Sequence, residues 1–213
     1  MNTYVYEFES KLYINLTNRC TNACVFCVRN GNQGVGRHNL WLDKEPTAAE
    51  VIEDLKRMRF WEYDEVVFCG FGEPTFKLDE ILEIGQFLKR IPLNGGVPGI
   101  FPQGSAKGGV VRLNTNGHGN LIHGRDITGE LARAVDAVSI SLNASTAKGH
   151  QEICNSEYGE KAFDAMLEFT RLCVPKFKRT VLSVVDTIGK DEIERCRKVC
   201  ETTGAEFRVR EIM

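Results

Sequence analysis

The sequence contains no uninterrupted apolar run that approaches the roughly 18 residues of a membrane-spanning helix. It also has no basic cluster, because its 27 lysines and arginines are spread along the chain and the formal net charge is -2. Proteins that bind nucleic acid present a basic stripe or patch, so nucleic acid is not indicated as a bulk partner. The N-terminus lacks the cationic flank and apolar run of a secretory signal. These absences favour a soluble, cytoplasmic protein.

Cysteine is too scarce for a disulfide scaffold, since the 213 residues include 8 cysteines and such scaffolds exceed roughly 8–10%. Without a secretion signal, these residues should mostly remain thiols. Cys20, Cys24 and Cys27 nevertheless stand close together in the stretch CTNACVFC. Reduced cysteines at this spacing indicate a metal.

Short β-branched runs alternate with longer helical patterns, which is typical of βα units and a mostly parallel sheet. We therefore expect an α/β fold with a single domain over residues 1–213. Periodicity alone fits both an incomplete β/α barrel and an open, doubly wound sheet. Strands are expected over residues 12–16, 65–70, 109–114, 136–143, 180–185 and 206–210, and helices over 47–58, 78–91, 128–135, 158–173 and 191–204.

Both architectures place their functional sites at the carboxyl ends of the strands. Four polar segments follow a predicted strand directly, so we expect them to share one rim of the sheet. They cover residues 17–27, 70–75, 115–120 and 143–145. The segment rich in glycine and proline at residues 94–109 precedes a strand, and we expect it on the opposite rim with no catalytic role.

Two kinds of metal centre fit three neighbouring cysteines. A structural zinc site closes with four ligands, often as two separated pairs, and Cys69, Cys154 or His38 is the candidate for the fourth. A cluster of four irons also takes four cysteines as a rule, and three would leave one iron open to another ligand. The spacing alone does not choose between them.

The motif CxxxCxxC after the first strand, with Phe26 just before its last cysteine, resembles the radical S-adenosylmethionine (SAM) superfamily. That family usually carries GGEP after its second strand, whereas residues 70–74 here read GFGEP, so Phe71 replaces the first glycine. The resemblance covers nearly the whole chain and implies a partial (β/α)6 TIM-like barrel. The segments LNTNGHGNLIHGR, VSISLNA and EFRVR also look like the TatD-linked radical SAM proteins, a group associated with TatD-type hydrolases.

The resemblance implies one 4Fe–4S cluster held by Cys20, Cys24 and Cys27, with SAM chelating the open iron. It implies reductive cleavage of SAM to methionine and a 5'-deoxyadenosyl radical, which abstracts hydrogen from an unidentified small-molecule or protein substrate. The electron donor would be a protein such as flavodoxin or ferredoxin. The implied cofactor-binding residues are Phe26, Gly70, Gly72, Glu73, Pro74, Thr115, Asn116, Ser141, Asn143 and Val185.

The catalytic residues cannot be assigned from these motifs, although two candidates follow predicted strands. Cys154, expected in a loop, has a thiol that can donate a hydrogen atom, and His118 can act as an acid or base near neutral pH. His123 and Arg125 are candidates for binding an anionic substrate, as are Arg29, Arg37 and Trp41 in the glycine-rich segment after the cluster. Cys173, Cys196 and Cys200 should pack in the core, and Cys69 under the rim.

Three other functions remain open at this point. One is an activase that installs a radical on a partner protein. The others belong to different classes: a zinc-stabilised binding module and a plain iron–sulfur electron carrier.

Overall fold

The computed structural model describes residues 2–31, 34–90 and 109–211, so residues 94–108 of the glycine- and proline-rich segment lie outside the described residues. A seven-stranded sheet forms its centre, in the order β1-β2-β5-β6-β7-β8-β9. The first pair is antiparallel and all other pairs are parallel. The strands are β1 (Val5–Phe8), β2 (Lys11–Ile14), β5 (Glu65–Phe68), β6 (Val110–Thr115), β7 (Ala137–Ser141), β8 (Arg179–Val185) and β9 (Glu206–Arg210).

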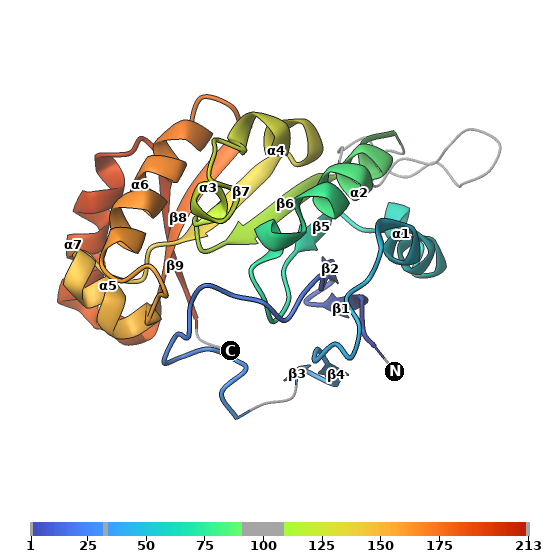
Figure 1. Cartoon of the computed structure of the whole chain (residues 1–213), viewed down its shortest axis with the longest axis horizontal. Coiled ribbons are helices and arrows are strands. Elements are labelled where there is room, and N and C mark those ends of the chain that lie inside the picture. The colour runs from blue at the N-terminus through green and yellow to red at the C-terminus, as the bar shows by residue number, and fades with distance from the viewer. Residues whose placement is uncertain (1, 32–33, 91–108, 212–213) are drawn as a thin grey trace.

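The strand order decides between the two predicted architectures. A doubly wound sheet reverses its direction of winding at a switch point, whereas here every strand from β2 to β9 pairs with the next strand of the sheet in chain order. The helices accordingly lie over one face of the sheet (Figure 1). All six predicted parallel strands are confirmed, and the fold is a β/α barrel that stays open between its first and last strands. The antiparallel strand β1 was not predicted.

Seven α-helices are found in the described part of the chain. Helix α1 begins at the predicted capping box, where the Thr47 side chain accepts from the Glu50 amide and the Glu50 carboxylate accepts from the Thr47 amide. The short helices α3 and α5 were not predicted. The helices are α1 (Ala48–Arg57), α2 (Leu78–Arg90), α3 (Gly119–His123), α4 (Thr128–Ala134), α5 (Ala147–Cys154), α6 (Lys161–Cys173) and α7 (Lys190–Glu201). None of them is long and apolar enough to cross a membrane.

The two faces of the sheet differ in polarity. Side chains alternate between the faces along a strand, and one set, including Phe68 and Leu113, packs in the main core cluster with residues of the helices. The predicted core cysteines Cys173, Cys196 and Cys200 belong to this cluster, which confirms that prediction. The other face of β6 carries Arg112 and Asn114, so polar groups are available on the side of the sheet that the helices leave open.

Candidate functional site

The cysteine loop, residues 15–31, follows β2 and runs across the carboxyl ends of the strands (Figure 1). It is attached to the end of α5, since the Ala23 amide donates to the Cys154 carbonyl at 3.0 Å and the Val25 amide to the Ile153 carbonyl at 2.9 Å. Asn22 also forms an isolated β-bridge with Ser156. The loop therefore lies between the first and fourth βα units of the barrel, on the rim that the sequence predicts.

The three motif cysteines are free thiols and half-buried on this loop. Among the described residues, no three histidine, cysteine or acidic side chains converge as a ready-made metal site. The Cys24 thiol lies close enough to that of Cys154 for the two to influence each other's pKa. Burial and the nearby Glu73 carboxylate raise the pKa of Cys20 to about 12, so that thiol holds its proton at neutral pH unless a metal displaces it. The donor set consists of three thiols on one loop, none of them in a disulfide, and it fits an iron–sulfur cluster.

The GFGEP turn is packed directly against the cysteine loop. A Cβ atom on Gly72 would lie 2.4 Å from the Thr17 carbonyl oxygen and 2.5 Å from that of Arg19, so no larger residue fits there. The Glu73 amide donates to the Arg19 carbonyl at 2.7 Å. At Gly70, a Cβ atom would meet the Asn15 side chain at 2.0 Å. Both glycines thus allow two loops to approach each other, which is a physical role within this chain apart from the cofactor contact implied by the resemblance.

Glu73 is 2% exposed and its carboxylate receives four hydrogen bonds. Oε1 accepts from the Thr75 amide at 3.1 Å, from Thr75 Oγ1 at 2.8 Å and from Thr115 Oγ1 at 2.7 Å, while Oε2 accepts from the Asn116 amide at 2.7 Å. Burial raises the pKa of Glu73, and these donors oppose the rise by stabilising the anion. Glu73 therefore ties the turn after β5 to the end of β6, with Pro74 buried beside it.

A second set of hydrogen bonds joins the end of β6 to the cysteine loop. Asn116 Nδ2 donates to Thr21 Oγ1 at 2.8 Å and also lies 3.9 Å from the Cys20 sulfur. Thr21 Oγ1 lies 2.8 Å from His118 Nδ1. Thr21 was not predicted as a site residue, although its place beside Cys20 in the motif was a signal. The network places Asn116, a predicted cofactor residue, next to a predicted cluster ligand.

His118 is fully buried, and burial lowers its pKa to about 4. Its imidazole is therefore neutral at pH 7, which does not suit the predicted role of an acid or base near neutrality. As pH falls below about 6.5, the unfolded chain takes up a proton that the folded chain excludes until about pH 4. We expect the free energy of unfolding to fall by roughly 3 kcal/mol over this window because of His118 alone.

Urea denaturation between pH 7 and pH 4 tests this expectation. In His118→Asn, which retains a polar atom near Thr21, the free energy of unfolding should fall less over this pH range than in the wild type. The buried His150 and titrating carboxylates contribute the rest of the fall in both proteins. Equal declines in the wild type and the variant would contradict the assignment.

The ends of β7 and β8 complete the rim. Asn143, at φ 61° and 1% exposed, donates from Nδ2 to the Cys154 sulfur at 3.6 Å, whereas its buried Oδ1 has no partner. Asn22 Oδ1 and His150 Nε2 are also buried without a partner. Buried polar atoms are nearly always hydrogen-bonded, so unpaired atoms around the cysteine loop fit a site that binds a polar ligand. Ser141 is half-buried at the end of β7, and Val185 is fully buried at the end of β8.

Cys154 corrects one prediction, because it is not a loop thiol but the last residue of α5, where it is fully buried. Its contact with Cys24 places it beside the cluster motif. Cys69 was expected to pack under the rim. It is instead half-buried on the open face, in the field of Arg112 and Arg210.

Four of the remaining candidates for substrate contacts, His123, Arg125, Arg29 and Trp41, are engaged within the chain. His123 Nε2 lies 2.7 Å from the Thr75 carbonyl, and Arg125 forms a bidentate pair with Glu130 of α4. Arg29 packs over the Trp41 ring at 4.8 Å, next to the hairpin of β3 (Gly34–Val35) and β4 (His38–Asn39). Arg37 is exposed in the turn of this hairpin.

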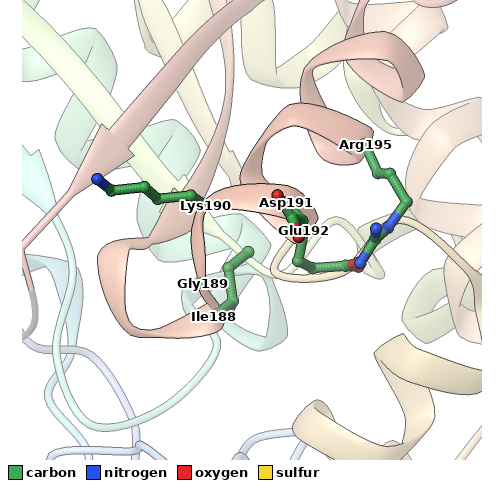
Figure 2. A pocket seen from close by; sticks show the side chains of 6 residues that line it. All are labelled: Ile188, Gly189, Lys190, Asp191, Glu192 and Arg195. Atoms are coloured by element: carbon green, nitrogen blue, oxygen red, sulfur yellow. The ribbon is translucent and has the colours of Figure 1, made fainter.

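A pocket of about 300 Å³ lies at the start of α7, on the same rim (Figure 2). Figure 2 shows Glu192 meeting Arg195, while Lys190 points away from this pair. Glu192 is held in place, since it accepts from the Ser145 amide at 2.6 Å. None of the predicted cofactor residues lines this pocket, which is formed by Ile188, Gly189, Lys190, Asp191, Glu192 and Arg195.

Residues 14–200 match the family model described as the Radical SAM superfamily. The chain belongs to this superfamily. The cysteine motif and the glycine-containing turn that carried the resemblance both lie inside the matched region. A 4Fe–4S cluster and SAM are the cofactors that this superfamily implies.

Solved structures of radical SAM enzymes share the fold. A radical SAM methyltransferase from Sphaerobacter thermophilus superposes with a TM-score of 0.61 at 16% identity, covering 97% of this chain and 57% of that chain. SuiB from Streptococcus suis bound to S-adenosylmethionine gives 0.64 at 18% identity, covering 97% and 41%. SuiB bound to its precursor peptide SuiA gives 0.63 at 16% identity, covering 98% and 40%. This radical SAM chain thus spans about half the length of these proteins or less. No curated protein sequence matches it.

Proposed function

We propose that this radical SAM enzyme holds one 4Fe–4S cluster on Cys20, Cys24 and Cys27 and uses it to cleave SAM for hydrogen abstraction from a substrate. The observation that carries the proposal is the contact between the two motifs: the loop with three free thiols is bound to the Gly-Glu-Pro turn at Gly72 and Glu73. When bound, the cluster and SAM together supply a carbon-centred radical that takes a hydrogen atom from a substrate carbon.

The protein's own residues orient this chemistry. Glu73 fixes the turn after β5 relative to β6, so that residues of two neighbouring strand ends keep a constant geometry. Asn116 extends from the end of β6 to the sulfur of Cys20. The unpaired Oδ1 of Asn143 is an acceptor for a donor group of a ligand at the end of β7. Phe26, half-buried on the cysteine loop, supplies apolar surface of the kind that an adenine ring packs against, whereas the Val185 side chain is fully buried.

The substrate stays open between a small molecule and a protein. One structural neighbour, SuiB, has been solved with a precursor peptide, and an activase that places a radical on a partner protein is the second candidate. The resemblance to the TatD-linked group, the hydrolase partner, the flavodoxin or ferredoxin donor and the cytoplasmic location all remain predictions. So does the single core domain over residues 1–213, which the continuous seven-stranded sheet supports.

The decisive test is anaerobic reconstitution with iron and sulfide, followed by reduction with dithionite in the presence of SAM. We expect the broad visible absorbance of an iron–sulfur cluster and formation of methionine and 5'-deoxyadenosine that depends on the reductant. A colourless protein with one zinc per chain would instead show the binding module, and a cluster that never yields 5'-deoxyadenosine would show the electron carrier.

The same assay distinguishes the substrate classes. Stimulation of 5'-deoxyadenosine formation by a fraction of cell metabolites would indicate a small-molecule substrate. A glycyl radical signal on an added partner protein would indicate the activase.

A further inference from the structure

Strand β9 places two arginines on the same face of the sheet. Arg208 and Arg210 are two positions apart and pair in register with Ser183 and Val185 of β8. Arg210 is the last residue of β9, and in Figure 1 the end of this strand lies close to the blue cysteine loop. The edge strand thus brings a cation to the rim where Cys20, Cys24 and Cys27 lie.

The guanidinium of Arg210 faces the cysteine loop. Its central carbon lies 5.9 Å from the centre of the ring of Phe26, which stands between Cys24 and Cys27 in the motif. Burial lowers the pKa of Arg210, and the thiols of Cys69, Cys24 and Cys154 oppose this effect. Arginine nevertheless stays protonated in proteins, so the side chain carries a fixed positive charge among thiols.

The charge of Arg210 is not neutralised by an acidic side chain. Arg112 and Arg179, also on β-strands of the barrel, pair with Glu65 at 2.6 Å and with Glu206 at 2.7 Å. No ion pair in the described part of the chain includes Arg210. A half-buried cation without an acidic partner is costly unless a negative charge is bound nearby.

We propose that Arg210 stabilises the reduced state of the cluster and thereby sets its reduction potential. On reduction, one electron passes from the external donor to the cluster, so three thiolates and the cluster gain one negative charge while Arg210 keeps its proton. A fixed cation beside Phe26, between two of the cluster cysteines in the motif, lowers the free energy of that more negative state. This inference rests on the proposed function, because it requires the cluster to be held by the three cysteines.

The test is a redox titration of the reconstituted protein, in which the electron paramagnetic resonance signal of the reduced cluster is measured at each potential. In Arg210→Gln we expect the ratio of reduced to oxidised cluster at a fixed potential to fall about tenfold. For a one-electron couple, this corresponds to a reduction potential about 59 mV lower. Arg210→Lys keeps the charge and should change the ratio much less. Arg208→Gln removes the same charge from the same strand, two residues further from the loop. It should also change the ratio less than Arg210→Gln does.

Iron and sulfide contents must match between the variants, and Arg210→Met provides a second neutral replacement if the glutamine variant loads poorly. A potential of the neutral variants equal to that of the wild type would overturn the inference, and would favour an anionic substrate group as the partner of Arg210. An equal shift in Arg208→Gln would overturn it as well, since the effect would then depend on net charge alone. A wild-type protein that assembles no cluster would instead contradict the proposed function.

Discussion

Replacing Cys20, Cys24 or Cys27 singly with serine is expected to abolish cluster loading and the formation of 5'-deoxyadenosine. Serine is nearly isosteric with cysteine, but its hydroxyl is a poor substitute for the soft thiolate that iron–sulfur clusters require. Reconstituted wild type should bind about four irons per chain, and each variant should bind far less. The measurement is the iron and acid-labile sulfide content together with the visible absorbance, followed by chromatography of the SAM cleavage products.

Two further thiols on the same rim serve as matched controls. Cys69→Ser removes a half-buried thiol at the end of β5, and Cys154→Ser removes the buried thiol that accepts from Asn143 Nδ2 at the end of α5. Both variants should load a full cluster. If Cys154→Ser lost the cluster while Cys24→Ser retained it, the assignment of the three ligands would be wrong.

Glu73→Ala should destabilise the protein by about 3 kcal/mol, because it leaves buried donors from Thr75, Thr115 and Asn116 without an acceptor. The loss should be visible in urea denaturation of the protein without cofactors. Since Glu73 also fixes the turn relative to β6, we expect weaker SAM binding in calorimetry of the reconstituted variant. Glu73→Gln retains one oxygen acceptor and should lose less stability than Glu73→Ala.

The control for this prediction is Glu83→Ala, which removes an exposed carboxylate from the solvent side of α2. Its effect should stay within about 0.5 kcal/mol, as for most surface substitutions. A Glu73→Ala variant as stable as the control would show that the carboxylate does not tie the two strand ends together.

The candidate site shows where sequence patterns are sufficient and where they are not. The strand ends identified the turn at residues 70–74 and the segment at 115–120, and the structure brings both against the cysteine loop. The resemblance implied that Gly72 and Glu73 contact the cofactor. In the fold, their nearest partners are the chain's own carbonyls and hydroxyls, which a motif does not reveal because it omits the residues that pack around it.

Two residues illustrate the same limit. Cys154 was expected in a loop after the fourth predicted strand, yet Thr146 caps α5 there by accepting from the Gly149 amide. Arg210 received no role, although the rule that strand ends share a rim applies to β9 as to the other strands. Its proximity to Phe26 of the cysteine loop became visible only when both ends of the barrel were in place.

The sequence by itself determined the six parallel strands, five of the seven described helices and the cysteine spacing, because hydrophobic period, caps and motifs are properties of neighbouring residues. Only the tertiary structure decided that the sheet winds in one direction and that Glu73 is saturated by hydrogen bonds. It also decided that Arg210 reaches the cysteine loop. These features depend on contacts between segments that are distant in the chain, and such contacts are set by the packing of the whole sheet and not by any local pattern.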